Sequence, residues 1–560
     1  MNRNLGCLLT VLATLFHSAI PNVNAETATG IVYEDRNGNR RRDPDEIGIP
    51  KVLVSNGREF VPTDAVGKYS IEIKEDDILF VVKSARYRLP TNKDFLPQFY
   101  YIHKPQGSPD FSNVEPANRG LLSRVEDLFG KEEDPIYPGV EPTGPLPESI
   151  NFPLIPATVE SKFDVVLLAD PQPDSYRELE YFRDDVVAEM VNEPAVRNAA
   201  FGVTLGDLMS EHLEFFPEYN SIMGQIGKPW FNVIGNHDLN LQSPTDEYSD
   251  ETWHRNFGPN YYAFFHGEVL FVALDNVEWS HFPPGQIQGD APADKMGDFA
   301  PRLGEVQIRW LESLLEHHPS EKLVVLMVHV PLEIEKGGLT LDRGEVYRLL
   351  EGRKALVLAG HMHTQEHHWI GTASGFQSDP QLHQMVCVPA SGGYWKGTRD
   401  ERGIPTGLTA DGVDNGYVIL SIDGSDYKTA YKAAGKPWSH QIRILSPVGH
   451  VGGKTEVVVN VLAGSDRSNV SFQVDGGPSI KMKRDIRSDP LVTRLREERD
   501  KNLPNAAVKP EPFNTHIWVS PLPPDLAGGI HTITVTEIDC YDREHRVSSI
   551  FMVDRASESE

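Results

Sequence analysis

The stretch FNVIGNHD at Phe231–Asp238 joins an apolar, β-type run to the polar ending Gly-Asn-His-Asp. Four other segments have the same form, an apolar run that ends in Asp, Gln or His: Val165–Gln172 (VVLLADPQ), Gly202–Asp207 (GVTLGD), Leu323–His329 (LVVLMVH) and Leu356–His363 (LVLAGHMH). Each apolar run predicts a strand that is buried on both faces. Because ligands collect at the carboxyl ends of strands in open α/β sheets, we expect the five polar endings to meet at one site.

These endings supply candidate metal ligands of two chemical kinds. Carboxylate and amide oxygens suit hard divalent cations, whereas imidazole nitrogen suits zinc, iron and manganese. One carboxylate can bridge two ions, and two metals about 3.5–4 Å apart form a clamp for in-line displacement at phosphorus. Any one such residue alone could be a helix cap, a turn residue or a buried core residue. As a convergent set they predict a metal centre made of Asp170, Gln172, Asp207, Asn236, His329, His361 and His363.

The ordered blocks resemble the motifs of the calcineurin-like metallophosphoesterases, namely Asp170-x-Gln172, Gly206-Asp207, Gly235-Asn236-His237-Asp238, His329 and Gly360-His361-x-His363. The resemblance covers roughly residues 162–423 and includes Phe257–Asn276, which is similar to the strand pair that follows the family's GNHD block. It implies a βαββα-type sandwich core with two metals at its rim. Some secreted members carry a β-domain on each side of this core, and the chain is similar to that three-domain type.

The resemblance also implies a role for each residue. The first metal would be held by Asp170, Gln172, Asp207 and His363, and the second by Asn236, His329 and His361 together with the bridging Asp207. His237 would act as a general acid near the leaving group, and Asp238 would orient it, because a carboxylate fixes the tautomer of an imidazole and keeps it protonated.

The first block departs from the family pattern, which usually has Asp-x-His, because Gln172 replaces the histidine. A neutral amide oxygen is a harder and weaker ligand than an imidazole nitrogen. The predicted cofactors are therefore two divalent metal ions, with manganese or iron favoured and zinc or magnesium as alternatives.

The first residues have the form of an export signal, with Arg3, an apolar run over Leu5–Phe16 and a small residue at the end of Val23-Asn24-Ala25. The run is shorter than the roughly 20 apolar residues that span a bilayer, so we expect cleavage and no membrane span afterwards. The predicted location is periplasmic or extracellular. The 560-residue chain has a formal net charge of −28, which disfavours nucleic-acid binding.

The distribution of elements predicts a multidomain protein of the α/β plus all-β class. Short strands with turns fill Thr29–Ser84, β-rich segments follow the core, and helices are expected at Glu178–Glu193 and Val306–His317. The expected fold is a central metallophosphoesterase β-sandwich flanked by helices, with a small β-sandwich at each end. The predicted regions are a signal peptide at 1–25, an N-terminal β-sandwich-like domain at 26–103, a linker rich in Pro, Gly and acid at 104–161, the metallophosphoesterase domain at 162–425 and a C-terminal β-rich domain at 426–560.

The loop DRNGNRRRDPDE at Asp35–Glu46 places oxygen-bearing residues at the ligand positions of an EF-hand calcium loop. Against a calcium site, Arg40 stands at the position of the usual glycine, and three arginines offset the carboxylates. Calcium in the N-terminal domain and an ion-free polar hairpin are therefore both open, with the ion-free hairpin slightly favoured.

A loop rich in glycine and aromatic residues, Pro389–Tyr417, follows the last metal-binding block. Its composition is typical of a loop over the mouth of an active site. Tyr394 and Trp395 could stack on a substrate ring, or they could cover the edge of the core.

The predicted function is that of an exported dinuclear-metal phosphoesterase, a metal-dependent phosphoric ester hydrolase that uses a metal-bound hydroxide to cleave phosphate monoesters or diesters. The alternative is a cell-surface binding or adhesion protein with a weakened phosphoesterase core. The sequence leaves open the natural substrate, the choice between monoester and diester, the metals, the role of the flanking β-domains and the oligomeric state.

Overall fold

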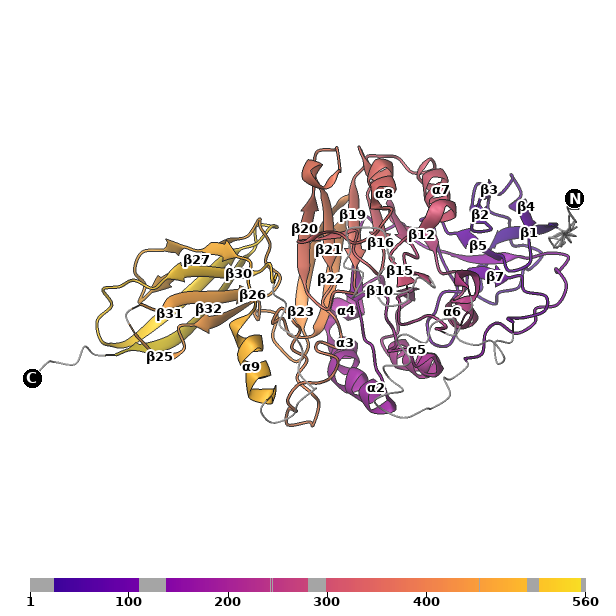
Figure 1. The fold of residues 1–560 in the computed structure, drawn as a ribbon. Helices are drawn as coiled ribbons and strands as arrows, with labels where there is room; N and C mark the ends of the chain where they lie inside the picture. Colours follow the sequence, from indigo (N-terminus) through magenta and orange to yellow (C-terminus); the bar gives the residue numbers. More distant parts are fainter. Residues whose placement is uncertain are drawn as a thin grey trace, which may run out of the picture.

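The computed structural model describes residues 25–109, 137–279, 299–452, 454–500 and 513–554, except positions 242 and 244. Three domains form a row, with the N-terminal β-domain at one end, the core in the middle and the C-terminal β-domain at the other end (Figure 1). The predicted signal peptide, apart from Ala25, and residues 110–136 of the predicted linker lie outside the described residues. Across the described ranges, none of the helices is long and apolar enough to pass through a membrane.

The N-terminal domain is a sandwich of two four-stranded sheets with the orders β4-β1-β8-β6 and β3-β2-β5-β7. The strands are β1 (Glu26–Glu34), β2 (Leu53–Ser55), β3 (Phe60–Pro62), β4 (Lys68–Ile73), β5 (Ile78–Val82), β6 (Tyr87–Arg88), β7 (Tyr100–Ile102) and β8 (Phe152–Pro156). Burial in β4 alternates strictly, which places one face of the strand in the core and the other in solvent.

The core contains two larger sheets that pack face to face. The five-stranded sheet has the order β11-β10-β9-β22-β23 and is formed by β9 (Lys162–Leu168), β10 (Phe201–Leu205), β11 (Trp230–Val233), β22 (Gly416–Asp423) and β23 (Asp426–Ala433). The six-stranded sheet has the order β12-β13-β16-β19-β21-β20 and is formed by β12 (Tyr262–His266), β13 (Val269–Ala273), β16 (Val324–Met327), β19 (Ala355–Ala359), β20 (Glu366–Ile370) and β21 (Leu382–Val386).

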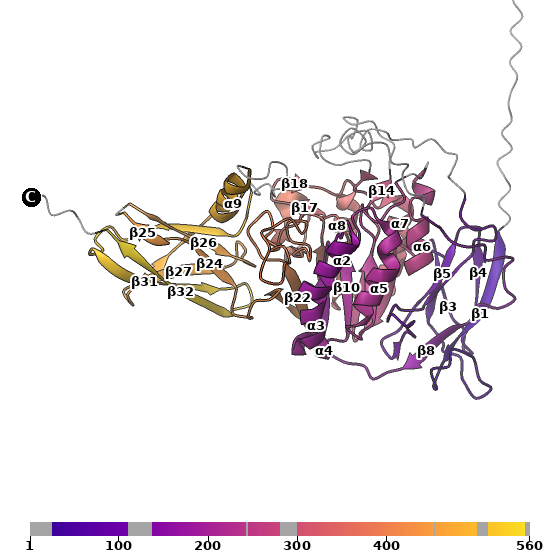
Figure 2. The ribbon, with the colours of Figure 1, turned by 90° about the horizontal axis from the view of Figure 1, so that it is seen from below.

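Helices cover the outer faces of both core sheets (Figures 1 and 2). In β9, Val165 and Leu167 join the cluster between the sheets, whereas Val166 and Leu168 join the cluster under the helices. This strand is therefore buried on both faces, as its continuous apolar sequence predicts. The five-stranded sheet is covered by α2 (Tyr176–Phe182), a π-helical turn (Arg183–Val187), α3 (Ala188–Asn192), α4 (Pro194–Asn198) and α5 (Phe216–Gly224), and the six-stranded sheet by α7 (Gly304–Leu315) and α8 (Arg343–Leu350).

Shorter elements join the core strands. They are the 3₁₀ turns Leu213–Phe215, Asp246–Tyr248 and Thr372–Ser374, helix α6 (Glu251–Phe257), and the strand pairs β14 (Glu278–Trp279) with β15 (Phe299–Ala300) and β17 (Glu333–Ile334) with β18 (Gly337–Gly338).

The C-terminal domain is a second sandwich, with the sheet orders β24-β26-β30-β29 and β25-β32-β31-β27-β28. The region that the sequence predicts to be β-rich therefore forms strands, which confirms the expected fold class. The elements are β24 (Ile442–Ser446), β25 (Gly449–Val451), β26 (Glu456–Val461), β27 (Asn469–Val474), β28 (Ile480–Lys481), β29 (Lys483–Asp485), α9 (Pro490–Asp500), β30 (Ile517–Pro521), β31 (Gly529–Ile538) and β32 (Glu544–Val553).

Two predicted domain limits differ from the topology. The limit at residues 425–426 falls inside the hairpin of β22 and β23, and both strands belong to the core sheet. The predicted linker 104–161 contains β8, which pairs in parallel with β1 of the N-terminal domain. The N-terminal sandwich therefore takes one strand from the linker, and the C-terminal domain starts after Ala433.

Candidate metal centre

The candidate ligands lie at the carboxyl ends of five strands that belong to the two core sheets. β9, β10 and β11 lead to Asp170 with Gln172, to Asp207 and to Asn236, whereas β16 and β19 lead to His329 and to His361 with His363. Strands β9, β10 and β11 are mutually parallel, and so are β16 and β19, so their carboxyl ends share one edge of the sandwich.

The backbone at these positions is unusual. Five of the candidate ligands have a positive φ, which few residues other than glycine adopt. They are Asp170 (45°), Gln172 (37°), Asp207 (51°), His361 (70°) and His363 (54°). Such conformations are strained and concentrate at functional sites, where the surrounding structure imposes them.

Gly206 shows how tightly this edge is packed. Its φ is 90°, and a Cβ added there would lie 2.3 Å from Nδ1 of His329. Only glycine can therefore precede Asp207, because any side chain would displace the neighbouring imidazole.

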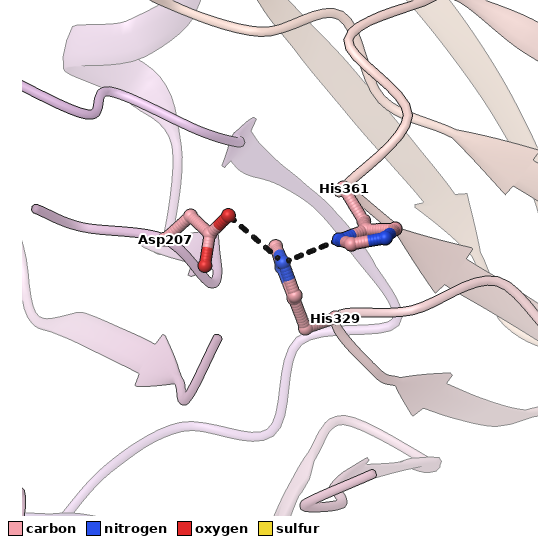
Figure 3. A group of neighbouring side chains, drawn as sticks. All are labelled: Asp207, His329 and His361. Carbon is pink, nitrogen blue, oxygen red and sulfur yellow. Dashed lines mark hydrogen bonds and ion pairs between the residues drawn. The ribbon is translucent and has the colours of Figure 1, made fainter. Parts of the chain in front are cut away.

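The second group of ligands converges on one atom, Nε2 of His329 (Figure 3). This nitrogen lies 3.1 Å from Oδ2 of Asp207, 3.1 Å from Oδ1 of Asn236 and 3.2 Å from Nδ1 of His361. The other ring nitrogen, Nδ1, lies 2.8 Å from the carbonyl oxygen of Leu205, which can only accept a hydrogen bond. The proton of a neutral His329 is therefore on Nδ1, and Nε2 presents a lone pair.

Oxygen atoms of Asp207 and Asn236 thus face the lone pair of a neutral His329 in a buried place, which is unfavourable unless a cation lies between them. Ligand atoms of Asp207, His329 and His361 lie within 4.8 Å of one another, the spacing of a metal-binding group. Without such a cation, burial lowers the pKa of His329, but Asp207 outweighs burial and the pKa rises to about 9. A single proton on Nε2 of His329 cannot form good hydrogen bonds with three neighbouring atoms at once, whereas a divalent cation can bind several ligand atoms.

The first group of ligands lies on the other side of Asp207. Oδ1 of Asp170 is 3.6 Å from Nε2 of His363, and the amide nitrogen of Gln172 donates to Oδ2 of Asp207 at 2.9 Å. The amide oxygen of Gln172 is buried and has no hydrogen-bond partner. An orphaned buried carbonyl costs free energy, and a metal ion in this position would satisfy it.

The charges of the centre also favour cations. Asp170 and Asp207 are buried, and the ion pairs that they form within the described residues involve histidines only. Burial raises the pKa of Asp170 to about 8 in the absence of metal. Burial lowers the pKa of His361 to about 3 and that of His363 to about 4, so both imidazoles are neutral and offer lone pairs near neutral pH. The donor set therefore fits two divalent metal ions.

Three family models match consecutive parts of the sequence. They are the N terminal of calcineurin-like phosphoesterase at residues 36–115, calcineurin-like phosphoesterase at 163–365 and the C terminal of calcineurin-like phosphoesterase at 385–545.

The chain belongs to the calcineurin-like phosphoesterase family.

The three matches follow the order of the three domains, so the family and the three-domain arrangement expected from the sequence motifs are confirmed. Family membership supports a phosphoester hydrolase and implies divalent metal ions. No curated protein matches the sequence.

Several solved structures resemble the calcineurin-like fold of this chain at low identity. A PhoD structure is 12% identical, with 73% of this chain and 85% of that chain covered and a TM-score of 0.36. A purple acid phosphatase from yellow lupin (Lupinus luteus) seeds is 10% identical, with 73% and 67% covered and a TM-score of 0.34. A 5'-nucleotidase from Candida albicans is 13% identical, with 49% and 52% covered and a TM-score of 0.27.

His237, the expected general acid of this phosphoesterase, lies at the edge of the centre with its side chain 32% exposed. Its backbone N–H donates to Oδ1 of Asp207 at 2.9 Å. Its Nδ1 lies 3.3 Å from a carboxylate oxygen of Glu211, close enough for an ion pair although outside hydrogen-bond geometry. Burial lowers the pKa of His237, but Asp207 and Glu211 outweigh it and raise the pKa to about 9.

The expected pairing of Asp238 with His237 differs from the structure. The two carboxylate oxygens of Asp238 accept hydrogen bonds from the backbone N–H groups of Gly235 and Met209. Asp238 therefore stabilises the loop that carries Asn236, and Glu211 is the carboxylate next to the imidazole. Glu211 follows the Gly206-Asp207 block by four residues, and it belongs to none of the sequence motifs.

The two aromatic residues of the glycine-rich loop have different roles. Trp395 is buried and its indole N–H donates to the carbonyl of Pro171 at 3.1 Å, so it covers the core. Tyr394 is 41% exposed and stacks on the His363 ring, with 4.3 Å between the ring centroids. Tyr394 is therefore the aromatic residue at the mouth of the metal centre.

Proposed function

We propose that the protein is an exported phosphoesterase that depends on two divalent metal ions and hydrolyses phosphate monoesters or diesters. The observation that carries this proposal is the convergence of Asp207, Asn236 and His361 on Nε2 of His329. Membership of the calcineurin-like phosphoesterase family supports the reaction class.

The residues divide into two metal-binding groups around Asp207. We infer that the first metal is held by Asp170, Gln172, Asp207 and His363 and the second by Asp207, Asn236, His329 and His361. The bridging role of Asp207 is supported by its Oδ2 atom, which contacts both Gln172 at 2.9 Å and His329 at 3.1 Å. When bound, two such ions would supply positive charge for the phosphate group and make a water molecule acidic enough to serve as nucleophile near neutral pH.

The remaining residues of the site would position the substrate and move a proton. His237 is partly exposed at the rim, and the nearby Glu211 carboxylate favours its protonated form. An imidazolium in this place can donate its proton to the leaving oxygen of the ester. Tyr394 would form an aromatic wall beside His363 for the leaving group.

The activity is tested with the full-length protein loaded with manganese, using p-nitrophenyl phosphate and bis-p-nitrophenyl phosphate. We expect turnover of at least one ester, and its identity distinguishes a monoesterase from a diesterase. Asp207→Ala should lower kcat/KM about 10³-fold or more, because it removes a ligand of both ions. Asp426→Ala, whose side chain is 85% exposed on β23, is the matched control and should keep wild-type activity.

Two results would contradict the proposal. One is full activity of Asp207→Ala with an unchanged circular dichroism spectrum. The other is a wild-type protein that holds two manganese ions per chain and hydrolyses neither ester, which would instead favour a binding or adhesion role.

Export is supported by Arg3, the apolar run Leu5–Phe16 and the small residue Ala25. We infer cleavage after Ala25 and a mature protein outside the cytoplasm. Amino-terminal sequencing of the protein from its native host should start at Glu26. A cytoplasmic protein that keeps Met1 would contradict this part of the proposal.

A further inference from the structure

A cavity of ≈520 Å³ lies where the N-terminal domain meets the core. Its walls come from the N-terminal domain around β6 and β8 and from the segments that lead into β10 and β11. Its aromatic lining residues include Phe201, Phe231 and Phe264, and the last two stack with 4.0 Å between ring centroids. Ligand sites of proteins commonly have this size, aromatic side chains in their walls and a place at a domain interface.

This cavity lies at the end of the core sheet opposite to the metal centre. Phe201 is the first residue of β10 and Phe231 the second of β11, whereas Asp207 and Asn236 follow the other ends of these strands. Since a strand rises about 3.3 Å per residue, the six steps from Phe201 to Asp207 correspond to a separation of roughly 20 Å. A molecule in the cavity would therefore not touch the metal ligands.

The charge of the lining is opposite to that of the whole chain. Three cations, Lys83, Arg88 and Lys228, line the cavity together with one carboxylate, that of Glu160. Within the part of the chain that the structure describes, none of the three cations forms an ion pair, and Glu160 lies 3.6 Å from Nε2 of His266. In a chain with a net charge of −28, such an excess of unpaired positive charge is unusual.

Lys83 is the buried member of this set, with 5% of its surface exposed. Its ammonium group contacts the backbone carbonyl of Phe265 and lies 5.9 Å from the centroid of the Phe264 ring. Burial lowers the pKa of Lys83 to about 7, and burial also lowers that of His266 to about 3, so the histidine adds no positive charge. A buried ammonium with a carbonyl as its polar partner is poorly compensated, and an anion beside it would restore the balance.

We propose that this cavity binds an organic anion with an apolar body, whose charged group pairs with Lys83. The apolar body would lie against the rings of Phe201 and Phe231, and Arg88 and Lys228 would attract the anion to the entrance. Inorganic phosphate fits this cavity less well, because it has no apolar part to contact the aromatic walls. A neutral apolar molecule also fits less well, because it would leave Lys83 unpaired.

The test uses two fluorescent probes with the same aromatic skeleton. 8-Anilinonaphthalene-1-sulfonate carries a negative charge, whereas N-phenyl-1-naphthylamine lacks it. We expect the full-length protein to bind one molecule of the sulfonate per chain and to bind the neutral amine at least about tenfold more weakly, because a charge-assisted contact is lost. Lys83→Met should weaken sulfonate binding by about tenfold or more and leave binding of the neutral probe unchanged.

Three further variants control this result. Lys68→Met changes an exposed lysine on β4 of the same domain and should bind the sulfonate as the wild type does. Ala157→Trp places a large side chain at an exposed position of the cavity lining and should abolish binding of both probes without disturbing a buried residue. Asp207→Ala should leave binding unchanged, because the metal centre lies at the opposite end of the sheet.

The proposal would be overturned by equal binding of the two probes, by unchanged sulfonate binding in Lys83→Met, or by unchanged binding in Ala157→Trp. It would also be overturned if Asp207→Ala abolished binding, since the sulfonate would then occupy the metal centre. If Lys83→Met does not fold, as judged by circular dichroism, the two-probe comparison and Ala157→Trp decide the question.

Discussion

The metal centre of the core and the N-terminal loop Asp35–Glu46 are both rich in oxygen ligands, but their oxygen atoms face different partners. In the loop, the carboxylate of Asp35 accepts hydrogen bonds from the backbone N–H groups of Gly38, Asn39 and Arg40. The carboxylate of Glu46 accepts hydrogen bonds from the backbone N–H groups of Arg36 and Asp43, one on each oxygen. The loop therefore satisfies its two buried carboxylates with its own backbone.

In the metal centre, by contrast, acceptors face acceptors. Asp207, Asn236 and His361 approach Nε2 of His329, and the amide oxygen of Gln172 has no partner. Residue composition alone therefore does not identify a cation site. What distinguishes the two regions is whether buried lone pairs meet donors or one another.

The largest effect is expected when one asparagine is removed from each region. Asn236→Ala should lower kcat/KM for the p-nitrophenyl ester about 10²–10³-fold and reduce the bound manganese from two ions per chain towards one, because it removes a ligand of the second site. Asn39→Ala, the matched change in the N-terminal loop, should alter neither activity nor metal content. Equal losses in the two variants would mean that the regions do not differ in function.

The second test removes the acceptor at the centre of the loop. Asp35→Ala leaves three backbone N–H groups without their partner, and we expect a loss of about 2–3 kcal/mol in local stability. Hydrogen–deuterium exchange of residues 26–103 should show faster exchange in the variant, with the core unchanged. Millimolar calcium should not slow the exchange of the wild-type loop. Strong protection by calcium would instead make the loop an ion site, as we propose for the centre of the core.

The third and smallest effect concerns Glu537 on β31. One of its buried carboxylate oxygens has no hydrogen-bond partner, like the amide oxygen of Gln172 in the metal centre. Burial raises its pKa to about 7. A carboxyl group whose pKa is higher in the folded than in the unfolded state stabilises the protein at low pH, and this contribution is lost as pH rises through 7. Glu537→Gln should therefore raise the melting temperature at pH 8.5 relative to the wild type, by an amount equivalent to about 1–2 kcal/mol, and raise it less at pH 5.

If the variant melted at the same temperature as the wild type at pH 8.5, the Glu537 carboxylate would have a hydrogen-bond partner in solution, and the prediction would be wrong. Glu544→Gln, on the exposed side of β32, is the matched control and should show no pH-dependent difference.

The sequence was sufficient to predict the strands that carry the candidate metal ligands, because continuous apolar runs followed by Asp, Asn or His are local signals. It was not sufficient for contacts that depend on packing. The proximity of Glu211 to His237 arises from the conformation of a loop, whereas the sequence neighbour Asp238 was the obvious choice. The cavity beside Lys83 is formed by two domains, so no single segment could reveal it.

The residues around the limit predicted at 425–426 carry a local signal for a β-hairpin. The segment over β22 consists mostly of apolar, β-type residues, that over β23 mixes apolar and polar residues, and Asp423-Gly424-Ser425-Asp426 lies between them, with a φ of 64° at Gly424. A short turn with a glycine of positive φ between two β-type runs is typical of a β-hairpin. Both strands therefore belong together, and the boundary lies after the second one.

The pairing of β1 with β8 has a consequence for how the chain is made. Ile31 donates its backbone N–H to the side chain of Asn151, a partner that is 120 residues away. A ribosome delivers residues in order, so the first sandwich stays one strand short until the polypeptide has emerged almost to the start of β9. A protein that is translocated while still being synthesised would complete its amino-terminal domain only as its catalytic core begins to appear.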